Sequence, residues 1–118
     1  MKYYFEKKLN LSFSDSIERV KNVLKDNGLG IVSEIRMDEN LNKLDGNEFK
    51  PYLILGACSP EHAKEALRHE ENIGVLLPCN VVVASENDGT RVAVVNPLVA
   101  MQGVQNPALE PMAMEITE

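Results

Sequence analysis

The chain has 118 residues, 44% of them hydrophobic and 25% charged, and these proportions exclude both a disordered chain and a membrane-embedded one. Its length suits a single domain over residues 1–118, with a core large enough to fold without disulfides or metals. The net charge of -6 repels phosphate backbones and anionic lipid surfaces, so nucleic acid and membranes are not expected partners.

Residues 2–28 predict a strand followed by a helix. Apolar and polar side chains alternate over residues 2–9, which is the pattern of a half-buried strand. The next segment carries an apolar side chain every three or four residues, as an amphipathic helix does. Ser14 is the predicted cap at the start of this helix, and Gly28 suits the left-handed residue that ends it.

A second strand and a short connector are predicted next. In "GIVSEIRM", residues 30–37, Ile31 and Ile35 are expected on one side of the strand, with the charged residues facing outward. Asp38 is then expected to cap one or two turns of weak helix that end at Gly46.

The segment "YLILGACS", residues 52–59, is almost wholly apolar, so we expect a central strand that is covered on both faces. Gly56 within it indicates a close approach of another part of the chain. A helix is predicted to begin at Ser59 and Pro60, because a cap oxygen followed by proline is a common helix start. This helix should continue to about His69.

The remaining residues predict a hairpin and a helical tail. Strands over residues 79–86 and 91–95 flank "NDG", a strong hairpin signal. The tail is expected to form short helical pieces, one face of which carries Leu109, Met112, Ala113 and Ile116. The order of elements predicts the α+β class: a two-layer sandwich with a largely antiparallel sheet and helices on one face.

Three segments resemble the signature blocks of a known protein family. They read "GLGIVSEI", "YLILGACSPEHAKEAL" and "IGVLLPCNVVV", and their spacing resembles the family as closely as their wording does. Over roughly Tyr3 to Leu109 the chain is similar to a bacterial and archaeal family described as domain of unknown function 302.

The resemblance implies a β-α-β4-α fold of the TATA-binding-protein-like class, a homodimer, and no established activity. Likeness in fold to nucleic-acid and ligand binders does not by itself carry function. The family's Gly-Ala-Cys-x-Pro and Leu-Pro-Cys-Asn patterns stand here at residues 56–60 and 77–80. The chain departs from the family at Asn96, where aspartate is common, and in its tail, where Pro111 and the end at Glu118 imply a shorter closing helix.

Cys58 and Cys79 are the first candidates for a functional site. Cys58 lies just before a predicted helix start, where free backbone N–H groups and the helix dipole lower a thiol pKa. Cys79 follows Pro78 at the start of a predicted strand. Each cysteine has the alternative interpretation of a small hydrophobe in the core. No Cys-x-x-Cys pair is present, so the sequence gives little support for zinc.

Ser59, His62 and Asn80 complete the candidate set. His62 lies one helical turn from Cys58 and could share a proton or a metal with it; the alternative is a half-exposed surface histidine. Asn80 interrupts the apolar run "LLPCNVVV", so we expect it to be buried and hydrogen-bonded, either to the backbone or to a ligand beside Cys79.

Three hypotheses for the function follow. The first is a pocket for a small ligand at the sheet end that carries the five candidates, Cys58, Ser59, His62, Cys79 and Asn80. The second is a thiol-dependent redox or metal-handling protein that uses both cysteines. The third is a purely structural or interaction domain. The sequence identifies no cofactor, and it leaves open whether the chain is an enzyme.

Location and assembly can also be predicted. The first ten residues lack the continuous apolar stretch of a signal peptide, and no apolar run is long enough to span a bilayer, so we expect a cytoplasmic protein with reduced cysteines. Apolar side chains in the tail exceed what one short helix buries, which together with the resemblance predicts a homodimer. These side chains are Val99, Met101, Leu109, Met112 and Met114.

Overall fold

The structure is a computed structural model that describes residues 2–45 and 48–102. The elements follow in the predicted order, with one 3-10 helix, η1, in addition. They are β1 (Tyr4–Leu9), α1 (Phe13–Asp26), β2 (Gly30–Arg36), α2 (Met37–Asp45), β3 (Tyr52–Cys58), α3 (Pro60–His69), η1 (Glu71–Leu76), β4 (Cys79–Glu86), β5 (Gly89–Val95) and α4 (Pro97–Gln102). None of the helices in these two ranges is long and apolar enough to cross a membrane.

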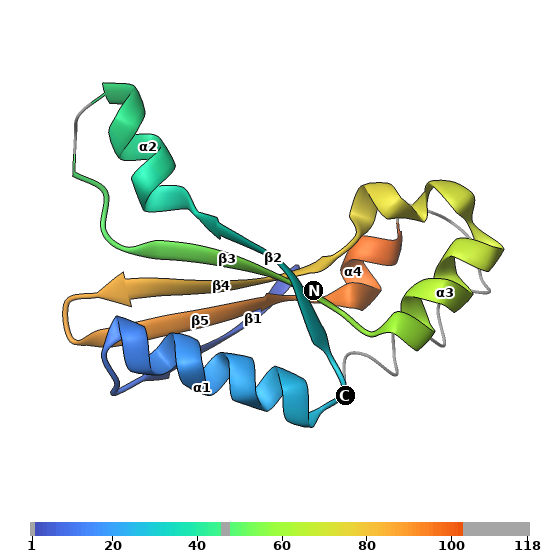
Figure 1. The fold of residues 1–118 in the computed structure, drawn as a ribbon, viewed down its shortest axis with the longest axis horizontal. Coiled ribbons are helices and arrows are strands. Elements are labelled where there is room, and N and C mark those ends of the chain that lie inside the picture. The colour runs from blue at the N-terminus through green and yellow to red at the C-terminus, as the bar shows by residue number, and fades with distance from the viewer. Residues whose placement is uncertain (1, 46–47, 103–118) are drawn as a thin grey trace.

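The five strands form one sheet in the order β1-β5-β4-β3-β2. Every neighbouring pair is antiparallel. The middle strand is therefore β4, whereas the sequence predicted β3, which has a neighbour on each side but lies next to the edge. Helix α1 packs on one face of the sheet, α2 extends beyond one end, and α3, η1 and α4 gather at the other end (Figure 1). This is the predicted α+β two-layer sandwich.

The core lies between α1 and the sheet. Side chains alternate between the two faces of a strand, and here every second residue of β3 and β4 points toward α1. The buried residues of this layer are Leu53, Leu55, Ala57, Val81 and Val83, and α1 covers them with Phe13, Ile17, Val20 and Leu24. The intervening residues, such as Ile54 and Val82, point to the opposite side, which we call the open face.

The cap of helix α1 lies two residues before the predicted one. The hydroxyl of Ser12 accepts a hydrogen bond of 3.1 Å from the backbone N–H of Asp15, so Ser12 is the N-cap. Ser14, the predicted cap, lies inside the first turn. Gly28 adopts φ of 78° just after the helix, which confirms its predicted role, because few other residues adopt this conformation without strain.

A β-bulge in β2 corrects the predicted arrangement of its isoleucines. Ile31 lies opposite Ala57 on the core side, whereas Ile35 lies opposite Ile54 on the open face, because the register shifts between Ile31 and Ser33. A bulge inserts one unpaired residue and so moves every later side chain to the other face. Ile35 is consequently 42% exposed.

Helix α2 begins at Met37 and not at a capping aspartate. Asp38 is buried, and its carboxylate accepts hydrogen bonds from Nε and Nη2 of Arg36 at 3.1 and 2.9 Å. The predicted stop at Gly46 and the predicted apolar face of the tail, from Leu109 onward, lie outside the described residues.

Gly56 confirms the predicted close approach to β3. A Cβ atom built on it would overlap Oγ of Ser33 and would lie 2.6 Å from Cγ of Pro78. Since real Cβ atoms do not come this close to other heavy atoms, any larger residue requires β2 or the residues before β4 to move.

Candidate functional site

The two cysteines lie at the same end of the sheet but on different faces. Cys58 ends β3 and Cys79 begins β4, and Cys79 pairs with Ala57. Residues directly opposite each other share a face, and the next residue along the strand points the other way. Cys79 therefore faces the core side, and Cys58 faces the open side. The fold brings the two backbones together without placing both thiols on one surface.

The environment of Cys79 disfavours thiolate chemistry. Burial raises the pKa of the Cys79 thiol above its ordinary value, and the nearby Cys58 raises it further. A raised pKa keeps the thiol protonated at neutral pH, whereas the thiolate is the nucleophile and the metal ligand. Both cysteines are free and half-buried. Cys79 thus resembles a packing residue more than a reactive one.

The side chains of Ser59 and His62 are hydrogen-bonded to each other. Ser59 is the N-cap residue of α3, but its hydroxyl makes no bond to the helix backbone. It lies 2.8 Å from Nδ1 of His62. The imidazole of His62, which the sequence suggested could share a proton or a metal with Cys58, thus has the hydroxyl of Ser59 within hydrogen-bond distance. Within residues 2–45 and 48–102, no three His, Cys, Asp or Glu side chains are grouped so that they could hold a metal ion.

Asn80 is exposed, which corrects the prediction that it is buried. It pairs with Gly56 across β3 and β4, so its side chain is on the open face. The error has a simple origin: the residues around Asn80 in the sequence are apolar, but only every second one points into the core.

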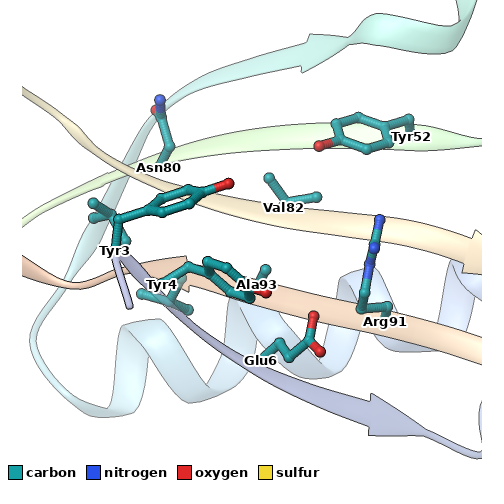
Figure 2. A pocket seen from close by; sticks show the side chains of 10 residues that line it. Tyr3, Tyr4, Glu6, Tyr52, Asn80, Val82, Arg91 and Ala93 are labelled. Carbon is teal, nitrogen blue, oxygen red and sulfur yellow. The ribbon is translucent and has the colours of Figure 1, made fainter. Parts of the chain in front are cut away.

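A pocket on the open face contains Asn80 and none of the other predicted site residues (Figure 2). Its volume is about 360 Å³. Four strands, β1, β3, β4 and β5, contribute to it. The lining residues are Tyr3, Tyr4, Glu6, Tyr52, Asn80, Val82, Arg91, Ala93, Val94 and Val95. All three tyrosines of the chain are among them, so we call it the tyrosine pocket.

The tyrosines form the sides of this pocket. Tyr3 and Tyr52 approach from opposite sides, and their hydroxyl groups point toward each other above Val82 (Figure 2). Tyr4 packs edge-to-face on Tyr3, with ring centroids 4.8 Å apart and an interplanar angle of 65°, a favoured aromatic geometry. The floor is provided by the small apolar side chains of Val82 and Ala93. A flat molecule could lie on this floor with a phenol at each side.

Arg91 and Glu6 bring opposite charges to the pocket. Nε of Arg91 is buried and has no hydrogen-bond partner among the described residues. Its ion-pair contact is Oε1 of Glu86 at 3.7 Å, which is beyond hydrogen-bond range. The carboxylate of Glu6 lies on the β1 side of the guanidinium (Figure 2), and the two groups form no ion pair with each other within the described chain. Two complementary charges therefore remain available to a ligand.

Sequence reasoning missed most of these residues. Tyr4 and Glu6 alternate with Phe5 on an edge strand, a pattern that indicates a solvated face. A usable signal was present, because a chain with no tryptophan has only three tyrosines, and Tyr3 and Tyr4 stand together in the first strand. Their meeting with Tyr52 depends on strand order, which local patterns do not show.

The fold and the pocket together define the class of protein: a two-layer α+β sandwich whose sheet has a hollowed face away from its main helix. The family model "Domain of unknown function DUF302" matches residues 5–118. The chain belongs to this family, as the three sequence blocks indicated.

A solved structure agrees with this assignment. It is described as the crystal structure of uncharacterized conserved protein DUF302 from Bacillus stearothermophilus, and it shares 28% sequence identity and a TM-score of 0.91 with this chain. The match covers 99% of this chain and 91% of that chain. No curated protein matches the sequence.

Proposed function

We propose that this domain binds a small planar molecule in the tyrosine pocket. The observation that supports this most directly is that all three tyrosines of the chain converge there with an incompletely paired arginine. The volume of about 360 Å³ is within the range of small-molecule sites, which are mostly apolar and carry a few convergent polar groups. The binding site proposed here is the pocket on the open face and not the group of residues around the two cysteines that the sequence suggested. Asn80 is the residue common to both.

The pocket has aromatic side chains that can contact a ligand over a large area and polar groups that can orient it. Aromatic side chains contribute large apolar areas, and stacked or edge-to-face ring pairs add about 0.5–1.5 kcal/mol to this. The hydroxyls of Tyr3 and Tyr52 and the amide of Asn80 can donate or accept hydrogen bonds at the rim. The role proposed is binding, because these groups recognise and orient a molecule without supplying a nucleophile and base that contact each other.

A fragment screen tests the proposal. We expect planar fragments to shift the NMR methyl resonances of Val82 and Ala93 in the intact chain. Val82→Trp fills the floor of the pocket and should abolish these shifts at Ala93. Val23→Trp is the matched control, since Val23 is 50% exposed on α1 and does not line the pocket. A screen without hits, or hits that bind the Val82→Trp chain equally well, would contradict the proposal.

A homodimer is a second proposal, which a separate observation favours. Three large apolar residues are exposed on the adjoining segments α3 and η1: Leu67 by 42%, Val75 by 85% and Leu76 by 40%. Exposed apolar groups of this kind often mark an interface. We expect sedimentation to show a dimer at micromolar concentration and Val75→Asp to weaken it. A wild-type monomer at high micromolar concentration would rule the dimer out.

We also propose that the protein is located in the cytoplasm. This location is supported by the two free cysteines, which a reducing compartment keeps as thiols. Cell fractionation with thiol labelling checks this: we expect the protein in the cytoplasmic fraction with both thiols unoxidised. Recovery from an extracytoplasmic fraction would contradict it.

A further inference from the structure

We infer that the ligand of the tyrosine pocket is a small aromatic zwitterion, such as an aromatic amino acid, whose carboxylate is held by Arg91 and whose ammonium group is held by Glu6. The inference rests on the proposed function and adds the chemical class of the ligand. It follows from how the two charged residues are placed relative to each other and to the tyrosines.

Arg91 is the cation of the pocket that retains unused hydrogen-bonding capacity. Its buried Nε has no hydrogen-bond partner among the described residues, and Oε1 of Glu86, at 3.7 Å, is too far away to accept a good one. The neighbouring cation, Lys8, lies opposite Arg91 on β1 but is already hydrogen-bonded to Asp88. A ligand carboxylate can take two parallel hydrogen bonds from an arginine, which a lysine cannot reproduce.

The carboxylate of Glu6 disfavours a ligand that carries only a negative charge. It lines the same pocket, and a ligand carrying only a carboxylate would be repelled by it. Glu86 adds a second negative charge near Arg91. A ligand that also carries an ammonium group converts the repulsion from Glu6 into an attraction. Complementary charges on both partners give specificity in addition to affinity.

The tyrosines account for an aromatic group on the ligand. Tyr3 and Tyr52 lie on opposite sides of Val82 (Figure 2), so a ring placed over Val82 contacts the edges or faces of both. Glu6 on β1 pairs with Ala93 on β5, two residues from Arg91, so both charged side chains lie on the β1–β5 side of Val82 (Figure 2). The apolar and the charged parts of the pocket are thus adjacent, as the two ends of an aromatic amino acid are.

Three probes with the same ring and different charges test the inference by calorimetry at pH 7 in low salt. They are phenylalanine, which has both charges, 3-phenylpropionate, which lacks the ammonium group, and 2-phenylethylamine, which lacks the carboxylate. We expect phenylalanine to bind about tenfold more tightly than either, because a charge-assisted hydrogen bond has roughly this effect.

Two variants then assign each charge to its partner. Arg91→Gln should weaken phenylalanine and phenylpropionate binding by about tenfold and leave phenylethylamine unchanged. Glu6→Gln should weaken phenylalanine and phenylethylamine and leave phenylpropionate no weaker. Arg68→Gln and Glu61→Gln on α3 are matched controls that should change nothing, since neither residue lines the pocket.

The outcomes separate this inference from the proposed function. If the three probes bind equally, or if Arg91→Gln weakens all three alike, the assigned ligand class is wrong although a planar-molecule site remains. If none of the three binds, the ligand class is also wrong, and the Val82→Trp fragment screen decides the proposed function independently.

Discussion

Three chain segments meet at Gly56, where there is no room for a side chain. Pro78 lies 2.6 Å from the position that a Cβ atom would take, and Ser33 is closer still. We expect Gly56→Ala to lower the free energy of unfolding by about 1–3 kcal/mol, since overpacking forces the surroundings to shift. Adding Ser33→Ala should restore part of this loss, because it removes one of the two clashing atoms.

Gly74 offers a matched control for this prediction. A Cβ atom at Gly74 would meet nothing within 4 Å, so Gly74→Ala should change the unfolding free energy by less than about 0.5 kcal/mol. Urea denaturation of the four chains measures all of these values. Equal effects at both glycines would mean that the close approach at Gly56 does not constrain the sheet.

Asp38 makes the stability of the chain dependent on pH. Its hydrogen bonds from Arg36 hold the pKa of the carboxyl below the ordinary value, and a backbone N–H bond from Tyr52 adds to this. A carboxyl with a lowered pKa stabilises the folded state fully above its unfolded pKa of about 4. This stabilisation is lost as the pH falls through the folded pKa.

Asp38→Asn should therefore reduce stability at pH 7 and lose its effect in acid. We expect a cost of about 1 kcal/mol, which is modest because the Arg36 side chain is 40% exposed and solvent screens the pair. The difference from wild type should stay constant from about pH 7 to pH 5 and shrink below about pH 4. Glu39→Gln is the control, since Glu39 is 61% exposed and 3.8 Å from Arg36. A difference that grew in acid would contradict the assignment.

At the scale of single elements, the start of α1 tests the capping assignment. Ser12 satisfies the N–H group of Asp15, so Ser12→Ala should cost about 0.5–2 kcal/mol. Ser14→Ala should cost nothing or stabilise slightly, because Ser14 lies within the helix and alanine is the better helix former. Thermal unfolding of the two variants distinguishes them, and the opposite ranking would restore Ser14 as the cap.

The elements themselves were predictable because their signals are local. Alternation in β1, Ser59 and Pro60 at the start of α3, and Asp-Gly in the hairpin each follow from a few neighbouring residues. The bulge in β2 was not predictable, because it depends on pairing with β3. The cap of α1 was misplaced by two residues because Ser12 and Ser14 are chemically equivalent in the sequence, and only the backbone geometry distinguishes them.

At the scale of the whole molecule, strand order explains why the site was mostly missed. The sequence correctly placed Cys58 and Cys79 at one sheet end, since strands that follow each other usually pair. It could not place Tyr3 near Tyr52, because β1 joins the sheet beside β5, the last strand of the chain. The tyrosine pocket is thus a product of long-range pairing and of the single face that α1 leaves uncovered.

The same arrangement predicts an uneven distribution of stability. Leu55, Val81 and Val83 on β3 and β4 are at most 1% exposed, so their amides should exchange hydrogen only when the whole domain unfolds. Helix α2 extends beyond the sheet (Figure 1), and Leu44 on it is 82% exposed. With little buried apolar surface to hold it, α2 should open independently of the rest.

Hydrogen exchange followed by NMR measures this difference directly. Amides of β3 and β4 should show opening free energies equal to the global value from denaturation, whereas α2 amides should fall several kcal/mol below it, since local openings range from near zero up to the global free energy. Asp38→Asn gives a second test of the same prediction, because the hydrogen bonds between Arg36 and Asp38 hold the first turn of α2 to the end of β2. This variant should lower protection in α2 more than in β4. Equal protection in α2 and β4 would show that α2 unfolds only with the sheet.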